Sequence, residues 1–486
     1  MTAPWRTRCA IAATILLFAG ACATSRNPAP RVTELRGTWI TTTANHAVAT
    51  PDDTANTMRR LAEIGTNTVY VEVWKNGYTQ FPSEVLTRTI GVDRNPGLSA
   101  GANKAARDLL QEMLIEAHRN GLVTIAWFEY GFMAAHQSTM NHLRQQKPDW
   151  LSRDINGNDV APNGFVWLNP VHPDARKLLL ELVLEAIDKY DLDGIQFDDR
   201  IVWPHVSMGY DDYTQQAYAR EHNGQLPPRD ARDPAWMRWR AEKVKALAKE
   251  LVQAIRVQRP GLVISLSPAV YPWSWENYLV AWPQWAAWSA PSWDEFVPQA
   301  YRLSYDEFEK TWQQQIDAMK TLGANRQRDL IAGIRIVGDG KDSSWEQLRD
   351  SIALTRRLEN GGHVLWFSRG VLDLYPTQLR EFYAQPANNP HFPAHWRRNS
   401  LPLFRAPAFA VPGQRLPWQV SALPPGRYRL IGQDESGWHY IDDNPVESTS
   451  GSTNVFFNIQ GNYRQVELVV DRRLEMQRPR RGSPLF

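Results

Sequence analysis

The chain has 486 residues, which is enough for one large domain and a smaller one. Hydrophobic residues make up 43% of it and charged residues 22%, as in an ordinary globular protein, and the net charge of +2 gives no case for a nucleic-acid partner. Tryptophan is abundant, with 21 residues whose flat apolar rings suit both protein cores and stacking on sugar rings. We expect most of them in the core and a functional minority in loops after strands.

The N-terminal segment has the pattern of a targeting signal. Two arginines precede an apolar run over residues 9–21, which is too short to span a membrane comfortably. Small residues before Cys22 resemble a bacterial lipobox, with Ala19 where leucine is usual, and an ordinary signal peptide is the alternative. Cys22 is the only cysteine left after cleavage, so it has no disulfide partner. We predict a signal peptide over 1–21, lipidation of Cys22, a tether over 22–33, and an outer-membrane lipoprotein that faces the periplasm.

Eight short runs rich in β-branched and aromatic residues follow one another along the chain. They span residues 36–42, 66–74, 122–131, 193–199, 262–269, 294–302, 329–336 and 361–370. Amphipathic stretches separate most of them, and the clearest are 52–64, 105–120, 173–190 and 236–258. Strand alternating with helix eight times predicts an α/β fold, a (β/α)8 TIM-like barrel over residues 34–387. The weakest connection, residues 271–293, is rich in Trp and Pro and is expected to hold at most one short helix.

The pattern changes after about residue 388. Runs such as WQVSAL, GRYRLIGQDE, NVFFNI and RQVELVVD alternate apolar and polar residues with period two. This alternation predicts a small β-sandwich accessory domain over residues 388–471. Residues 472–486 are basic and contain proline, which is typical of a disordered tail.

The fourth strand, in the sequence DLDGIQFDDR, ends in two adjacent carboxylates. Side chains of a strand alternate between its faces, so Ile195 and Phe197 share one face while Gln196 and Asp198 share the other. If the apolar pair packs against the outer helices, Asp198 points into the barrel mouth and Asp199 begins the following loop. Barrel enzymes present their catalytic groups at this end of the strands. A helix cap or a surface ion pair is the alternative explanation.

Glycoside hydrolysis needs two carboxyl groups on either side of the scissile bond, one protonated and one ionised. We expect Asp198 to be the ionised partner and Glu129, at the end of the third strand, to be the acid, because adjacent strands bring both within reach of one ligand. Glu129 paired with an arginine or bound to a sugar hydroxyl is an alternative, and Asp199 is the other candidate for the second carboxyl. Retention and inversion both remain open, since sequence gives no distances.

Polar and aromatic residues at other strand ends are candidates for substrate binding. Tyr and Arg at a barrel mouth can hold carboxylates or sugar hydroxyls, although a packing Tyr and a solvated Arg are the plainer explanation. The expected set is Trp74, Gln299, Tyr301, Arg302, Arg335 and Trp366. No zinc-binding spacing of His or Cys and no glycine-rich nucleotide loop is present in the sequence, so we expect no metal and no cofactor.

The barrel resembles the glycosyl-hydrolase-like family 10 of bacterial envelope proteins over roughly residues 34–385. The segments that carry the resemblance are RGTWITT, TNTVYVEVW, GLVTIAWFEYGFM, VWLNPVHPDAR, YDLDGIQFDDR and DEFVPQAYR. The family positions that carry over are Asp198, Asp199, Glu129 and the Tyr301–Arg302 pair. One departure is that this chain has Val-Ala-Trp around Ala281, where relatives often have Gln-Asp-Trp.

The resemblance implies a division-associated outer-membrane lipoprotein that cleaves peptidoglycan glycan strands lacking stem peptides. Its implied partners are the glycan strands, the outer membrane and cell-division proteins. Two other functions stay open at this point. One is a glycan-binding lipoprotein that keeps the barrel without catalysis, which the departure at Ala281 motivates. The other is a lytic transglycosylase, which forms an anhydro end without water.

Overall fold

The computed structural model describes most of the chain from Val32 onward. The described residues are 32–99, 107–322, 325–338, 340–392, 404–405, 416–434, 437–441, 446–449, 453–459 and 462–471. The predicted signal peptide, the predicted lipidation site Cys22, most of the predicted tether and the predicted basic tail lie outside the described residues. Among the described residues, no helix combines the length and the apolar character needed to cross a bilayer.

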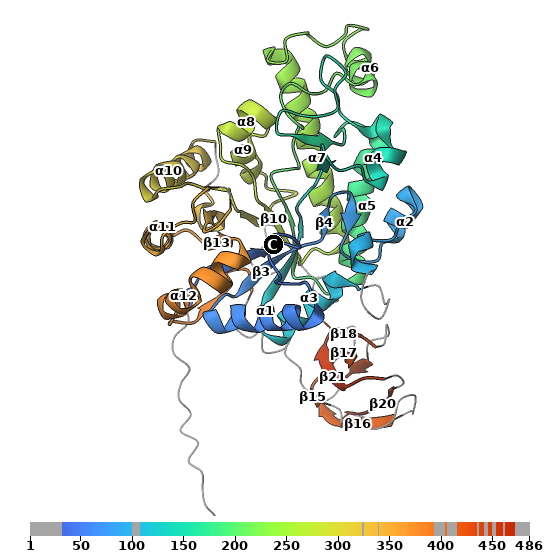
Figure 1. Cartoon of the computed structure of the whole chain (residues 1–486), viewed down its shortest axis with the longest axis vertical. Coiled ribbons are helices and arrows are strands. Elements are labelled where there is room, and N and C mark those ends of the chain that lie inside the picture. The colour runs from blue at the N-terminus through green and yellow to red at the C-terminus, as the bar shows by residue number, and fades with distance from the viewer. Residues whose placement is uncertain are drawn as a thin grey trace, which may run out of the picture.

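Eight parallel strands form the barrel (Figure 1). They are β2 (Leu35–Ile40), β3 (Thr68–Glu72), β6 (Val123–Phe128), β9 (Gly194–Phe197), β10 (Val263–Leu266), β11 (Glu295–Phe296), β12 (Ile331–Arg335) and β13 (Gly362–Trp366). Each strand pairs with the next one in this order, and β13 pairs with β2. Parallel bridges from Phe296 to Leu330 and from Gln299 to Gly333 join β11 to β12 and close the ring. Seven of the eight strands fall within the runs predicted from sequence and β2 begins one residue earlier, so the (β/α)8 barrel is confirmed.

Helices surround the barrel on its outside (Figure 1). They are α1 (Pro51–Ile64), α2 (Glu84–Ile90), α3 (Leu109–Arg119), α4 (His142–Gln146), α5 (Pro173–Lys189), α6 (Asp212–Glu221), α7 (Pro234–Gln258), α8 (Trp273–Tyr278), α9 (Trp282–Ala286), α10 (Tyr305–Thr321), α11 (Trp345–Arg357) and α12 (Pro376–Phe382). Thr50 caps α1 and Asp108 caps α3, each accepting a bond from a first-turn backbone N–H. The expectation of at most one short helix in residues 271–293 is wrong, since this connection holds both α8 and α9.

The β9 side chains lie as strand alternation predicts. Gln196 points into the barrel, where its side chain accepts a hydrogen bond from Trp39 Nε1 (2.7 Å) and donates one to Ser265 Oγ (2.9 Å). Phe197 packs with Phe128 and with Trp293. Asp198 follows on the Gln196 face, at the carboxyl end of the strand, so the barrel interior leads directly to this carboxylate.

Short elements extend the loops at both ends of the barrel. On the loops after β3 and β6 lie the hairpins β4 (Trp74–Lys75)–β5 (Tyr78–Thr79) and β7 (Met133–His136)–β8 (Phe165–Trp167). At the opposite end, β1 (Val32–Thr33) pairs with β14 (Ala387–Asn388). The remaining helical turns are Pro96–Ser99, Pro148–Trp150, Gln327–Asp329 and Gly370–Leu374. The chain stays packed on the barrel as far as Phe392, which belongs to the barrel core.

The C-terminal strands form two facing sheets. They are β15 (Phe404–Arg405), β16 (Leu416–Leu423), β17 (Gly426–Asp434), β18 (Gly437–Tyr440), β19 (Val446–Ser448), β20 (Thr453–Ile459) and β21 (Gln465–Val470). One sheet has the order β15-β21-β17-β18, with β19 also on β17, and β16 pairs with β20. Apolar residues of both sheets share one core, among them Val420, Leu430 and Leu468. The predicted small β-sandwich is therefore confirmed.

The sandwich contacts the barrel at α3 (Figure 1). Ile115 of α3 packs with Ile431 and Trp438. Arg119 lies 4.1 Å above the Trp438 ring and forms an ion pair with the buried Glu467 (3.0 Å). Apolar packing and a partly buried ion pair thus fix the small domain to the outer wall of the barrel, away from the carboxyl ends of the strands.

Candidate active site

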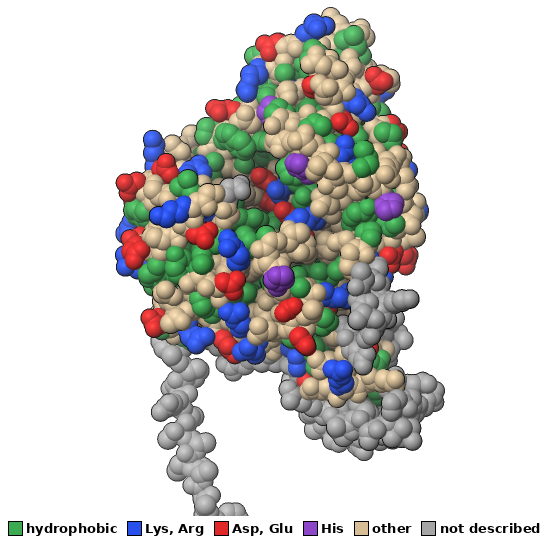
Figure 2. Space-filling model, in the orientation of Figure 1, with side chains coloured by type: hydrophobic (Ala, Val, Ile, Leu, Met, Phe, Trp, Pro, Cys, Tyr) green, Lys and Arg blue, Asp and Glu red, His purple; other side chains and the backbone are tan. Residues whose placement is uncertain are grey.

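Four carboxylates and two cations lie together at the carboxyl ends of β3, β6 and β9. They are Glu72, Glu129, Asp198, Asp199, Lys75 and Arg200. Figure 2 shows a hollow over the middle of the barrel, with acidic and basic side chains at its bottom. This is the end of a (β/α)8 barrel at which active sites are built.

Arg200 holds the two carboxylates at the end of β9. Its Nη1 donates to Asp198 Oδ2 and lies 3.3 Å from Asp199 Oδ1. Asp198 also accepts hydrogen bonds from Gln299 Nε2 and from the backbone N–H of Asp199. The Asp198 side chain is 3% exposed and that of Asp199 is 27% exposed, although Asp199 Oδ1 is itself buried.

Lys75 connects the carboxylates of β3 and β6. Its Nζ lies 2.8 Å from Glu72 Oε2 and 3.1 Å from Glu129 Oε2, while Arg200 Nη2 lies 4.0 Å from Glu129 Oε1. Glu72 is fully buried and also accepts bonds from the backbone N–H and the hydroxyl of Thr42. Glu129 therefore lies between Lys75 and Arg200. The buried Glu72 also binds Lys75 and so holds its ammonium group in place.

The loop after β6 positions Arg200. Gly131 has a φ of +45°, and a Cβ atom there would lie 2.5 Å from the Arg200 carbonyl oxygen, so only glycine allows this close approach. The same oxygen accepts a bond from Phe132 N (3.0 Å), and Arg200 Nη1 donates to the Glu129 carbonyl (3.0 Å). The Arg200 guanidinium also lies 5.7 Å from the Tyr130 ring centre. These contacts fix the guanidinium between β6 and β9.

Burial and mutual repulsion raise the pKa values of Glu72, Asp198 and Asp199. Burial, with the charge of Glu129 adding to it, raises the pKa of Glu72 to about 8. Burial raises the pKa of Asp198 well above its usual range, Arg200 opposes the shift, and the charges of Asp199 and Glu129 add to it. The pKa of Asp199 is raised by burial and by Glu129, again against Arg200. Four acids with two cations cannot all be ionised cheaply here, so the site retains protons near neutral pH.

Aromatic side chains line the barrel mouth beside the carboxylates. Tyr301 stacks on Trp366, with ring centres 5.7 Å apart, and both contact Trp39 edge-on. Trp127 packs edge-on against Trp366 at 5.9 Å. Tyr301 follows two residues after Gln299, which donates to Asp198, and burial and the charges of Asp198 and Asp199 raise the pKa of Tyr301. Of the predicted binding residues, the structure therefore brings Gln299, Tyr301 and Trp366 to the carboxylates.

The other predicted binding residues lie differently. Trp74 is 1% exposed and its indole N–H donates to the Gly131 carbonyl (3.0 Å), so it offers no open face to a ligand. The guanidinium of Arg302 is turned toward α10, where Nε donates to Thr311 Oγ1 (2.9 Å). Arg335 is buried, with Nη1 3.4 Å from Ser343 Oγ. These three side chains support the walls of the mouth in this structure.

Sequence reasoning gave no role to Lys75 and Arg200. The available signal was their position, since Arg200 directly follows the two acids of β9 and Lys75 lies three residues after Glu72 at the end of β3. A cation next to a carboxylate at the carboxyl end of a barrel strand is a candidate for setting that acid's charge. Ala281, the departure from the family pattern, directly precedes α9 in the connection from β10 to β11.

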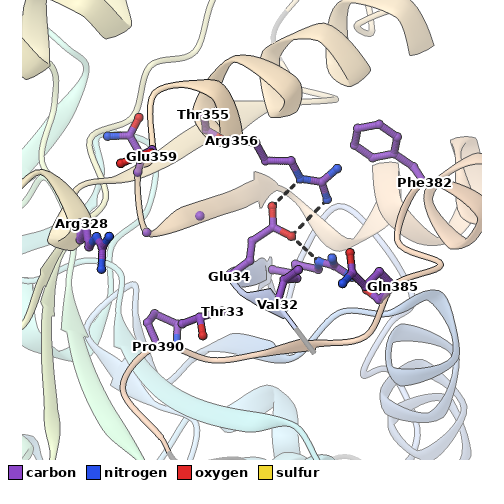
Figure 3. Close-up of a pocket in the computed structure, with 14 residues that line it drawn as sticks. Val32, Thr33, Glu34, Arg328, Thr355, Arg356, Glu359, Phe382, Gln385 and Pro390 are labelled. Carbon is purple, nitrogen blue, oxygen red and sulfur yellow. Dashed lines mark hydrogen bonds and ion pairs between the residues drawn. The ribbon is translucent and has the colours of Figure 1, made fainter. Parts of the chain in front are cut away.

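A second pocket, of about 550 Å³, lies at the opposite end of the barrel, where the strands begin (Figure 3). Glu34 is the buried acid in it, held by Arg36 (2.7 Å) and Arg356 (2.7 Å). The two arginines thus compensate the charge of Glu34. This end of a (β/α)8 barrel usually contributes to stability and not to catalysis. Among the described residues, no group of three or more His, Cys, Asp and Glu side chains is arranged to hold a metal ion.

Comparisons with known proteins identify the family of this chain. The family model of glycosyl hydrolase-like 10 matches residues 34–341. The chain belongs to this family. The glycosyl hydrolase DigH of Escherichia coli strain K12 is 26% identical over 226 residues, which are 43% of this chain and 45% of that protein. The glycosyl hydrolase YngK of Bacillus subtilis is 24% identical and covers 76% of this chain and 75% of that protein. The chain thus spans less than half the length of the Escherichia coli relative that it matches.

A solved structure supports the fold. The glycoside hydrolase domain of PgaB (BpsB) from Bordetella bronchiseptica aligns with a TM-score of 0.55 and 14% identity, over 74% of this chain and 100% of that domain. At this identity the likeness concerns the fold alone. Family membership and the shared barrel place this chain among the glycosyl-hydrolase-like proteins.

Proposed function

We propose that this protein is a glycosidase that cleaves glycosidic bonds in peptidoglycan glycan strands that lack stem peptides, as a lipoprotein of the outer membrane that faces the periplasm. The sequence resemblance to the envelope family and the segment before Cys22 support the substrate and the location. The same resemblance supports cell-division proteins as partners. The observation that carries the chemistry is the cluster in which Arg200 contacts Asp198 and Asp199 and lies near Glu129.

In the mechanism that we propose, Asp199 is the general acid and Asp198 is the ionised carboxylate. Burial raises the pKa values of both acids, and that of Asp198 more strongly, but the two acids share Arg200 and titrate as a pair. We assign the ionised carboxylate of the pair to Asp198, because it accepts three N–H donors that stabilise a negative charge, and the proton to Asp199. Asp199 is also the more exposed acid and gives its proton to the glycosidic oxygen as the bond from that oxygen to the anomeric carbon breaks. A water oxygen then bonds to the anomeric carbon, and its proton returns to a carboxylate of the site.

Glu129 has a supporting role in this mechanism rather than the acid role expected from sequence. It lies between Lys75 (3.1 Å) and Arg200 (4.0 Å), and its carboxyl group holds both cations beside the two acids of β9. Its negative charge next to Asp199 in turn raises the pKa of Asp199, which favours the protonated acid. This arrangement supports the alternative in which Asp199 is the second carboxyl.

The proposed anchor fits the orientation of the barrel. Val32, the first described residue, lies in β1 at the end where the strands begin, opposite the carboxylates. Nine residues lie between it and Cys22, and the ten Cα–Cα steps span at most about 35 Å. A lipid on Cys22 would therefore hold the far end of the barrel near the membrane and leave the mouth facing the glycan.

The test is digestion of purified sacculi, intact and after amidase treatment, with the products identified by mass. We expect soluble fragments with hydrated reducing ends from the amidase-treated sacculi and little release from intact ones. Anhydro ends would instead identify a lytic transglycosylase. Protein that pellets with sacculi and releases nothing would contradict the proposed substrate and support binding without cleavage of this polymer.

A further inference from the structure

The Trp-rich connection between β10 and β11 places two aromatic side chains at the mouth that the mechanism above does not use. Trp273 begins α8 and is 47% exposed, which is unusual for the largest apolar side chain. Tyr278 ends the same helix, and the two ring centres are 5.1 Å apart. Like the carboxylates, this helix follows a strand at its carboxyl end and so lies on the catalytic side of the barrel (Figure 1).

We propose that Trp273 and Tyr278 form a stacking subsite for a pyranose ring of the bound glycan, beyond the two sugars that flank the cleaved bond. The proposal rests on the proposed function, since it needs a polymeric substrate that extends out of the mouth. It assigns to α8 the recognition of chain length rather than a part in bond cleavage.

The platform is rigid. The α8 segment is tied to the loop after β9 by backbone bonds from Trp203 N to the Tyr278 carbonyl (3.1 Å) and from Val206 N to the Asn277 carbonyl (2.7 Å). Inside the segment, the buried Ser274 hydroxyl donates to the Val280 carbonyl (2.8 Å). The exposure of Trp273 is therefore not that of a loosely held loop, and a ligand that stacks on it would need little ordering of the protein.

The platform is continuous with the carboxylate cluster. The loop that begins at Asp199 carries Trp203, whose backbone N–H donates to the Tyr278 carbonyl (3.1 Å), so α8 is joined to the segment that holds the proposed acid. The Tyr278 hydroxyl accepts a bond from Asn163 Nδ2 (3.3 Å), and the Trp167 ring centre lies 6.4 Å from the Tyr278 ring centre. Burial and then the negative charge of Asp199 raise the pKa of Tyr278, in agreement with this connection.

The chemistry of the platform suits a carbohydrate. A pyranose presents axial C–H groups to an aromatic face while its hydroxyl and acetamido groups stay at the edge, which matches rings that are apolar on the face and polar at the rim. Polar groups stand at this rim, namely Asn163 and His205, whose ring is edge-on to Tyr278 at 5.9 Å. Burial and two nearby arginines lower the pKa of His205, so it is neutral at pH 7 and can hydrogen-bond a sugar.

The test compares Trp273→Ala, Trp273→Phe and a control, Val257→Ala. Val257 is 74% exposed at the end of α7 that leads into β10, on the side of the barrel opposite the mouth. The probe is glycan strands purified from amidase-treated sacculi, separated into short and long chains. For long strands we expect Trp273→Ala to raise KM about tenfold with kcat nearly unchanged, Trp273→Phe to recover most of the loss, and Val257→Ala to match wild type.

Chain length separates this proposal from a merely structural role. Loss of a general packing contact would lower kcat for short and long strands alike, whereas loss of a distal subsite leaves the shortest cleaved strands unaffected. An unchanged KM for long strands in Trp273→Ala would overturn the subsite. If wild type releases nothing from the strands, the proposed function fails, and the subsite is then judged by binding: retardation of wild type but not of Trp273→Ala in a native gel containing the strands supports it, and equal retardation overturns it.

Discussion

The two ends of the barrel shift the pKa values of their buried glutamates in opposite directions. Where the strands begin, Glu34 lies among Arg36, Arg356 and His363, and although burial alone would raise its pKa, these groups outweigh burial and lower it to about 2. Where the strands end, burial and the charge of Glu129 outweigh Lys75 and raise the pKa of Glu72 to about 8. Both side chains are buried and both have cationic partners.

The difference comes from the ratio of charges around each acid. Two arginines flank the single carboxylate of Glu34, as Figure 3 shows, so its ionised form is compensated. At the mouth, two cations serve four carboxylates. Charge compensation stabilises the closed end of the barrel, while the shortage of cations keeps protons on acids at the end where the proposed mechanism protonates a glycosidic oxygen. The contrast therefore separates a structural carboxylate from the candidate catalytic ones by their surroundings.

The largest effect is expected when a mouth carboxylate is neutralised. We expect Asp198→Asn to lower kcat/KM by about 10³- to 10⁴-fold on every substrate, because the ionised partner is lost. Asp199→Asn should lose about as much on glycan strands, but far less on aryl glycosides whose leaving group needs no proton. The measurement is kcat/KM on both substrate types, with thermal melting as the check that each variant is folded.

The two variants serve as controls for one another, since they replace adjacent acids that share Arg200. If Asp199→Asn lost the same factor on both substrate types while Asp198→Asn kept its activity on aryl glycosides, the two roles would be exchanged. Wild-type activity in Asp198→Asn would remove this site from the chemistry altogether.

The sequence was sufficient for the fold and for one edge of the site. Strand alternation places Gln196 inside the barrel and carries Asp198 to the mouth, because a period of two is a local property of any strand. The ion pairs of Lys75 could not be predicted in the same way, since they join β4, β3 and β6, and spacing along a chain contains no distances between strands. The sequence also could not predict the side-chain directions of Trp74 and Arg302. Their N–H groups donate to the Gly131 carbonyl and to the Thr311 hydroxyl instead of facing a ligand.

A middle-sized effect is expected at the closed end of the barrel. Glu34→Gln should lower the free energy of unfolding by about 3 kcal/mol at neutral pH, the value of a pKa shift from 4.5 to about 2. The contribution of Glu34 is fully present above pH 4.5 and is lost as pH falls toward 2, because the unfolded chain binds the proton first. Denaturant unfolding of wild type and variant at pH 3, 4, 5 and 7 measures this convergence, and kcat/KM should not change. A stability difference that stayed constant over this range would contradict the compensated charge of Glu34.

The sharpest test of the contrast is the pH dependence of Glu72→Gln. Glu72 has a folded pKa of about 8 against a usual value of 4.5, so between these values the folded protein holds one proton more than the unfolded chain. Wild-type stability from this group is therefore complete below pH 4.5 and declines as pH rises to 8, which is the reverse of Glu34. Glutamine cannot ionise, so the variant lacks this decline.

The measurement is the difference in the free energy of unfolding between Glu72→Gln and wild type, followed from pH 4 to pH 9. Glutamine changes the hydrogen bonds with Lys75 and Thr42, which shifts the whole curve by a constant, but only ionisation of Glu72 gives the difference a slope in favour of the variant. The slope should end near pH 8. Parallel curves would mean that Lys75 compensates Glu72 as fully as the arginines compensate Glu34, and the two ends of the barrel would then differ only in geometry and not in charge.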